Sequence, residues 1–95
     1  MSVEEILIMA EHLNQKTEPV SSAFNRIGKP LSETSRANAY KHCQQMGLDS
    51  AHAWSCVQAV AEQLERDQPY EAEAAGMKYL DLTGTYRLFA ALLCE

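Results

Sequence analysis

The sequence predicts an all-α protein, a compact bundle of five or six short helices built around a central helical hairpin. Apolar residues recur every three to four positions along most segments, and no stretch of four or more residues alternates as a strand would. Alanine is frequent and β-branched residues are few, which also favours helices. With 95 residues, 46% of them hydrophobic, the chain is expected to form one domain spanning 1–95.

The first two predicted helices lie in the N-terminal quarter of the chain. One covers residues 3–16, where Ser2 and Glu5 form a capping box that satisfies free amides at the helix start. The other covers residues 19–27 and ends at Gly28. Both carry an apolar stripe at helical spacing, so both are expected to pack against the rest of the bundle.

The central hairpin is predicted from residues 33–46 and 50–66. Ser32 and Asp49 stand where N-caps are expected, just before each helix. Gly47 falls between the helices, at a position where the backbone must turn left-handed. The hairpin is therefore expected to be a folding feature.

The contents of the hairpin core follow from the same pattern. Cys43 and Cys56 are read as buried free thiols, because unpaired cysteines behave as small hydrophobic residues. Trp54 is expected to anchor the core between them.

The fifth helix is expected to open at Pro69, and the last to cover residues 85–94 after a turn at 83–84.

The last predicted helix is unusually apolar. Its large residues sweep a wide arc, so the helix is either central to the core or shared with a partner. A basic and an acidic stretch of the chain would also permit self-association, and a homodimer is predicted on this helix. The residues assigned to self-association are Tyr86, Phe89, Leu92 and Leu93.

Charge is distributed unevenly along the chain. The formal net charge is −5, and all of it falls in residues 49–95, because acidic and basic residues balance in residues 1–48. This polarity bears on partners and not on the fold. An acidic partner-binding surface is predicted at Glu62, Glu65, Asp67, Tyr70, Glu71 and Glu73, with Tyr70 as its aromatic anchor, and a basic one at Arg26, Lys29, Arg36 and Lys41.

Metal and catalytic sites are not supported by the residue spacing. His52 and Cys56 lie four apart on one helix face, and only one of His42 and Cys43 could join them. Three ligands fall short of the four of a structural zinc site. No nucleophile motif or phosphate-binding glycine loop is present, so no metal, cofactor or enzymatic activity is predicted.

A DNA-binding helix-turn-helix is the alternative interpretation of the hairpin, with its turn at Gly47. The helix that would read the bases has no Lys or Arg before Arg66, whereas DNA affinity depends on cations that neutralise phosphates. The charge therefore disfavours nucleic-acid binding.

The function predicted first is a small, non-enzymatic protein–protein interaction module, such as a regulator, adaptor or inhibitor, acting through a charge-polarised helical surface. The partner is another protein of unknown identity. No membrane span is predicted, because no run of about eighteen apolar residues occurs. The N-terminal residues are acidic where a secretion signal is basic, so a cytoplasmic location is expected.

Overall fold

A computed structural model describes residues 26–93, and every regular element in that range is an α-helix. The helices are α3 (Glu33–Gln45), α4 (Ser50–Glu65), α5 (Pro69–Met77) and α6 (Leu82–Leu93). The all-α class is therefore confirmed. The helix predicted at 3–16 and most of the one at 19–27 lie outside the described residues.

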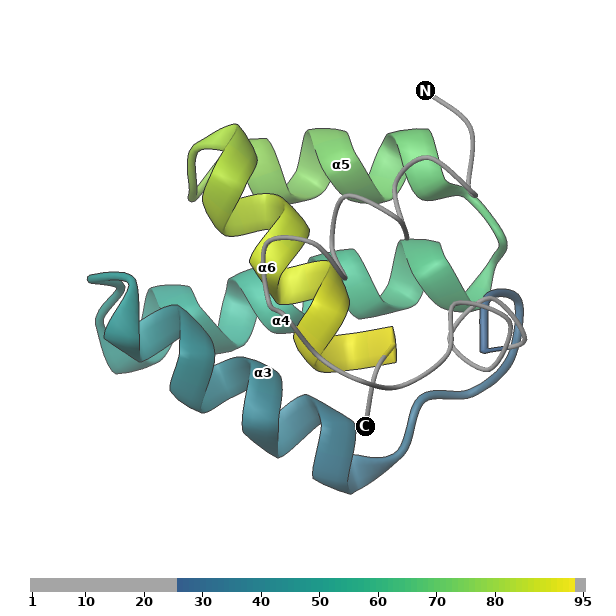
Figure 1. Cartoon of the computed structure of the whole chain (residues 1–95), viewed down its shortest axis with the longest axis horizontal. Coiled ribbons are helices and arrows are strands. Elements are labelled where there is room, and N and C mark those ends of the chain that lie inside the picture. The colour runs from purple at the N-terminus through teal and green to yellow at the C-terminus, as the bar shows by residue number, and fades with distance from the viewer. Residues whose placement is uncertain (1–25, 94–95) are drawn as a thin grey trace.

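Each of the four helices packs against two of the others (Figure 1). α4 packs against α3 on one side and α5 on the other, and α6 in turn packs against α3 and α5. In the figure α6 crosses the middle of the molecule, between α5 and α3. This arrangement leaves α6 with neighbours on several sides, whereas α3 and α4 each keep one exposed face.

The hairpin between α3 and α4 is built as the sequence predicts. Ser32 caps α3 by accepting a hydrogen bond from the Ser35 amide at 3.1 Å. Asp49 caps α4 by accepting one from the His52 amide at 2.8 Å. Gly47 has φ of +102°, a left-handed conformation that glycine adopts without strain.

The start of α6 differs from the prediction. The helix begins at Leu82 and not at residue 85, and Gly84 lies inside its first turn. The Asp81 carboxylate accepts a hydrogen bond from the Gly84 amide at 2.6 Å, which caps the helix. A Cβ at Gly84 would stand 3.1 Å from Asp81 Oδ1 and 3.2 Å from both Leu80 Cβ and the Met46 sulfur, so this glycine allows close packing at the start of α6.

The core is centred on α6. Tyr86, Leu88, Phe89, Leu92 and Leu93 are all at most 1% exposed. A helix that is apolar on nearly all sides becomes buried on nearly all sides, and this is the first of the two alternatives predicted for it. α4 contributes an apolar stripe to the same core, made of Ala53, Cys56, Val57, Val60, Ala61 and Leu64.

Candidate protein-interaction surface

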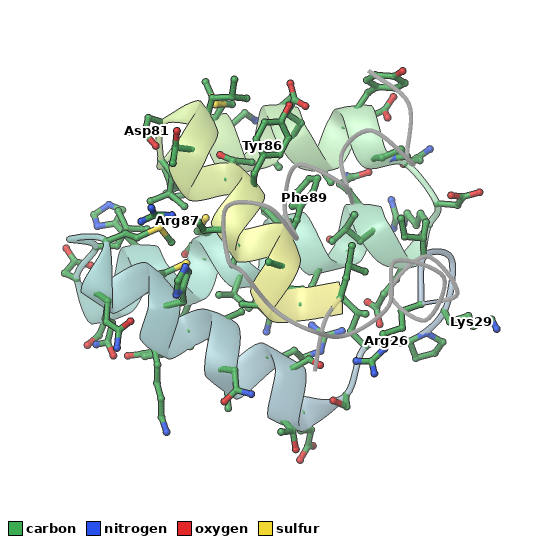
Figure 2. All side chains as sticks on the ribbon, viewed as in Figure 1. Arg26, Lys29, Asp81, Tyr86, Arg87 and Phe89 are labelled. Carbon is green, nitrogen blue, oxygen red and sulfur yellow. The ribbon has the colours of Figure 1, made fainter. Side chains whose placement is uncertain are left out.

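The residues predicted for self-association do not form an exposed face. Tyr86, Phe89, Leu92 and Leu93 are inside the core, and the rings of Tyr86 and Phe89 meet edge to face with centroids 6.2 Å apart (Figure 2). Their apolar character reflects the central position of α6. A contact between copies through these side chains would require the fold to open, so the self-association prediction is wrong in its location.

Half of the predicted acidic surface is engaged in contacts within the chain. Glu65 accepts hydrogen bonds from the Leu31 amide at 2.9 Å and from Arg36 at 2.8 Å. Glu73 accepts one from the Tyr86 hydroxyl at 3.0 Å. A further ion pair joins Glu62 to Arg66 at 2.7 Å, and the remaining members, Asp67, Tyr70 and Glu71, are exposed.

The predicted basic residues do not form one surface. Arg36 is paired with Glu65 from the predicted acidic surface, so the two surfaces partly neutralise each other. Arg26 and Lys29 lie in the turn around Gly28, whose amide donates to the Leu64 carbonyl at the end of α4. Lys41 is exposed on α3, beside the residues near the start of α4. Among the described residues, one member of each predicted surface is therefore used in a contact within the chain.

Trp54 is at the surface and not in the core. Its side chain is 45% exposed. The stripe that α4 buries is centred near Ala53, Val57 and Val60, and a residue that follows Ala53 points about 100° away from it. Trp54 therefore lies at the edge of the buried stripe, which is why the expectation of a core anchor is wrong.

The Trp54 ring is held against α3. Its centroid lies 5.8 Å from that of Tyr40, with the ring planes 55° apart. This is the range in which aromatic pairs attract each other. Tyr40 is half-buried and packs against the core, so it holds the exposed indole against the α3 side of the core.

Two open depressions flank Trp54 along the α3–α4 boundary, with volumes of about 580 and 590 Å³. Ala37 and Trp54 border both of them. Glu33 lies at one end and Lys41 at the other. We call this region the Trp54 surface, made of Glu33, Arg36, Ala37, Tyr40, Lys41, Gln44, Trp54 and Gln58.

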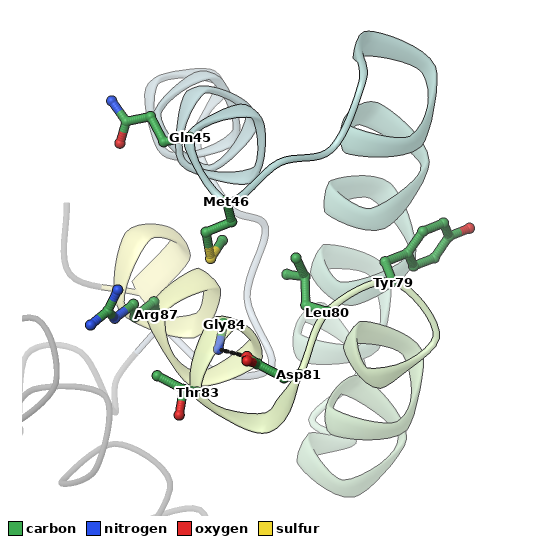
Figure 3. Close-up of a pocket in the computed structure, with 8 residues that line it drawn as sticks. All are labelled: Gln45, Met46, Tyr79, Leu80, Asp81, Thr83, Gly84 and Arg87. Atoms are coloured by element: carbon green, nitrogen blue, oxygen red, sulfur yellow. Dashed lines mark hydrogen bonds between the residues drawn. The ribbon is translucent and has the colours of Figure 1, made fainter.

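A third hollow, of about 370 Å³, lies between the end of α3 and the start of α6 (Figure 3). Met46 and Leu80 flank it, while Tyr79 and Gln45 point outward. The Gly84 amide at its base, which could otherwise bind an anion, is satisfied by Asp81. Among the residues that line this hollow, Arg87 is therefore the one cationic side chain, and the Gly84 amide is not open to a ligand.

The hairpin histidine and cysteines do not assemble into a metal site. Cys43 and Cys56 are fully buried, whereas His52 is exposed and its Nδ1 lies 2.8 Å from Asp49 Oδ2. Within residues 26–93 no three His, Cys, Asp or Glu side chains are grouped closely enough to hold a metal ion.

The exposed face of α4 bears on the helix-turn-helix alternative. The exposed residues along α4 include Ser50, Ala51, His52, Trp54, Ser55, Gln58 and Glu62, and none of them is a Lys or Arg. Asp49 stands at the helix start, where a reading helix would approach phosphates. The geometry of a helical hairpin is present, but the cations that DNA affinity needs are not on this face.

No protein-family model, no curated protein and no solved structure matches the chain. Within residues 26–93, none of the helices combines the length and apolar composition needed to cross a bilayer. The function of the chain is therefore inferred from its own residues.

Proposed function

We propose that this protein is a small, non-enzymatic interaction module, acting as a regulator, adaptor or inhibitor, and that it binds its partner through the Trp54 surface. The observation that carries this proposal is the exposure of Trp54, the single tryptophan of the chain, between two depressions. The buried positions of α4 are filled by residues smaller than tryptophan.

The composition of the Trp54 surface suits protein recognition. Tryptophan and tyrosine are enriched among the residues that dominate binding energy, because they offer a large apolar area with few rotatable bonds. Here the indole is positioned in advance by Tyr40, so little side-chain entropy is lost on binding. Polar side chains surround it, which matches the apolar centre and polar rim of known interfaces.

The proposed mechanism differs from docking by opposite charge. Arg36, Glu65 and Glu62 are engaged within the chain, so fewer charges are available to attract a partner than the sequence suggests. We expect the binding affinity to come mainly from burial of the Trp54 ring. The remaining charged side chains are expected to set the orientation of the bound partner. A cytoplasmic location is part of this proposal.

The test is a quantitative capture experiment from the native host. The tagged full chain, the Trp54→Ala variant and the Tyr70→Ala variant are compared by mass spectrometry. Tyr70 is the matched control, because it is an exposed aromatic residue on α5, away from the Trp54 surface. We expect one or more proteins to be recovered with the wild type and with Tyr70→Ala, and lost with Trp54→Ala.

The binding is then measured with the purified partner by calorimetry. Trp54→Ala is expected to weaken binding by at least about thirtyfold, the effect of removing a dominant interface residue. Thermal unfolding of each variant checks that the fold is kept. Equal recovery with Trp54→Ala and wild type, or equal loss with both variants, would contradict the proposal.

A further inference from the structure

The exposed face of α3 carries three residues at intervals of four. They are Glu33, Ala37 and Lys41, and all three are exposed. Residues four apart form one ridge on a helix surface, here about 12 Å long at about 1.5 Å per residue. An acidic and a basic side chain therefore stand at equal distances on either side of a small residue.

The two charged residues of this ridge are not engaged with other described residues. Within residues 26–93, the Glu33 and Lys41 side chains make no ion pair or hydrogen bond, whereas their neighbour Arg36 is paired with Glu65. The ridge also borders both depressions of the Trp54 surface, with Glu33 at one and Lys41 at the other. Its charges remain available to a partner.

The pattern of the ridge is complementary to itself. A two-fold axis at Ala37 would lay two copies of α3 antiparallel and bring Glu33 of each copy opposite Lys41 of the other. The two opposed charge pairs form together, and the small side chain at the centre allows the helices to approach closely. A parallel arrangement would instead oppose like charges.

We propose that a second copy of this chain binds the Trp54 surface, through an antiparallel contact between the two α3 helices centred on Ala37. The contact also covers Trp54, since Ala37 and Trp54 border the same two depressions. This inference rests on the proposed function, because it names the partner of that surface. It replaces the buried α6 face as the site of self-association.

The experiment is sedimentation equilibrium of the full-length protein. Protein–protein interfaces that bury little surface area bind weakly, so the concentration series runs from about 10 µM to about 0.5 mM. We expect a reversible monomer–dimer equilibrium in the wild type. The Tyr70→Ala variant keeps the wild-type dissociation constant, and Trp54→Ala weakens association by at least about tenfold.

Charge reversal tests the two-fold geometry. Glu33→Lys and Lys41→Glu are each expected to weaken association by at least about tenfold, because each creates two like-charge contacts in the dimer. The double variant Glu33→Lys/Lys41→Glu restores opposite charges and should return the dissociation constant to within about threefold of wild type. Thermal unfolding confirms that each variant is folded.

Three outcomes would overturn the inference. They are a strict monomer over the whole series, a dimer that tolerates both single reversals, and a double variant that remains as weak as the single ones. A strict monomer that still captures another protein in a Trp54-dependent way leaves the proposed function standing and overturns only the dimer. A dimer that is insensitive to Trp54→Ala, with no Trp54-dependent capture, contradicts both.

Discussion

The Arg36 guanidinium donates to Glu65 Oε1 over 2.8 Å, and this ion pair ties the first half of α3 to the end of α4. Arg36 also donates to the Gln58 side chain at 3.1 Å, and the other Glu65 oxygen accepts the Leu31 amide at 2.9 Å. The two charged side chains are 22% and 26% exposed, so water screens their attraction only partly. Residues predicted for two separate binding surfaces thus hold the hairpin together.

Removing the Glu65 charge should destabilise the fold. The Glu65→Gln substitution keeps the shape but replaces charge-assisted hydrogen bonds, and we expect it to lower the free energy of unfolding by about 1–2 kcal/mol. Urea unfolding of Glu65→Gln, Arg36→Gln and the double variant measures the coupling. If the two single effects simply add, the ion pair does not contribute.

Gly76 and Thr85 define a close approach of α5 and α6. A Cβ at Gly76 would stand 2.6 Å from Thr85 Cγ2 and 3.0 Å from its Oγ1. Alanine normally stabilises a helix interior by about 1 kcal/mol relative to glycine, but here we expect Gly76→Ala to destabilise by about 1–3 kcal/mol. The Thr85→Ser change removes Cγ2 and should recover part of the loss in Gly76→Ala/Thr85→Ser. Thermal unfolding that shows Gly76→Ala to be more stable than wild type would refute this packing.

The buried cysteines should be unreactive in the folded protein. Both thiols are fully buried, which keeps a reagent away from them. A hydrogen bond with Cys56, together with burial, also raises the pKa of the Cys43 thiol, whose thiolate is the reactive form. In a Cys94→Ser variant only Cys43 and Cys56 remain, and a thiol reagent should then modify the protein no faster than it unfolds. Rapid stoichiometric labelling without denaturant would show that the pair is accessible.

The Asp49 cap should make stability depend on pH in the acid range. Hydrogen bonds from the His52 backbone and side chain lower the pKa of the Asp49 carboxyl. A carboxyl whose pKa is lower in the folded state than in the unfolded state stabilises the fold at pH values above its unfolded pKa of about 4. This contribution is lost as the pH falls through the folded pKa. Asp49→Ala should therefore lower the melting temperature at pH 7, and the difference in melting temperature between the variant and the wild type should be smaller at pH 3. An equal gap at both pH values would exclude the charged cap.

Local features of the fold were predictable from sequence, and tertiary ones were not. The caps at Ser32 and Asp49 and the turn at Gly47 depend on neighbouring residues, so spacing alone locates them. Gly84 was predicted to be a turn residue but lies in the first turn of α6, and one of its close neighbours, Met46, is 38 positions away in the chain.

The candidate site was missed for a similar reason. Tryptophan is expected inside a small core, but its position on α4 relative to Ala53 places it at the edge of the buried stripe. Helical spacing could have found this from sequence. The pairing of Arg36 with Glu65 could not be found in this way, because it depends on how α3 crosses α4.

The fluorescence of Trp54 offers the most direct test of the central claim, that this residue is an exposed binding residue. Trp54 is the only tryptophan, so the emission reports on it alone. We predict that acrylamide quenches the emission of the free, dilute native protein strongly, and that quenching falls when the captured partner or a second copy binds. Weak quenching in the free protein, or strong quenching that binding leaves unchanged, would contradict the account.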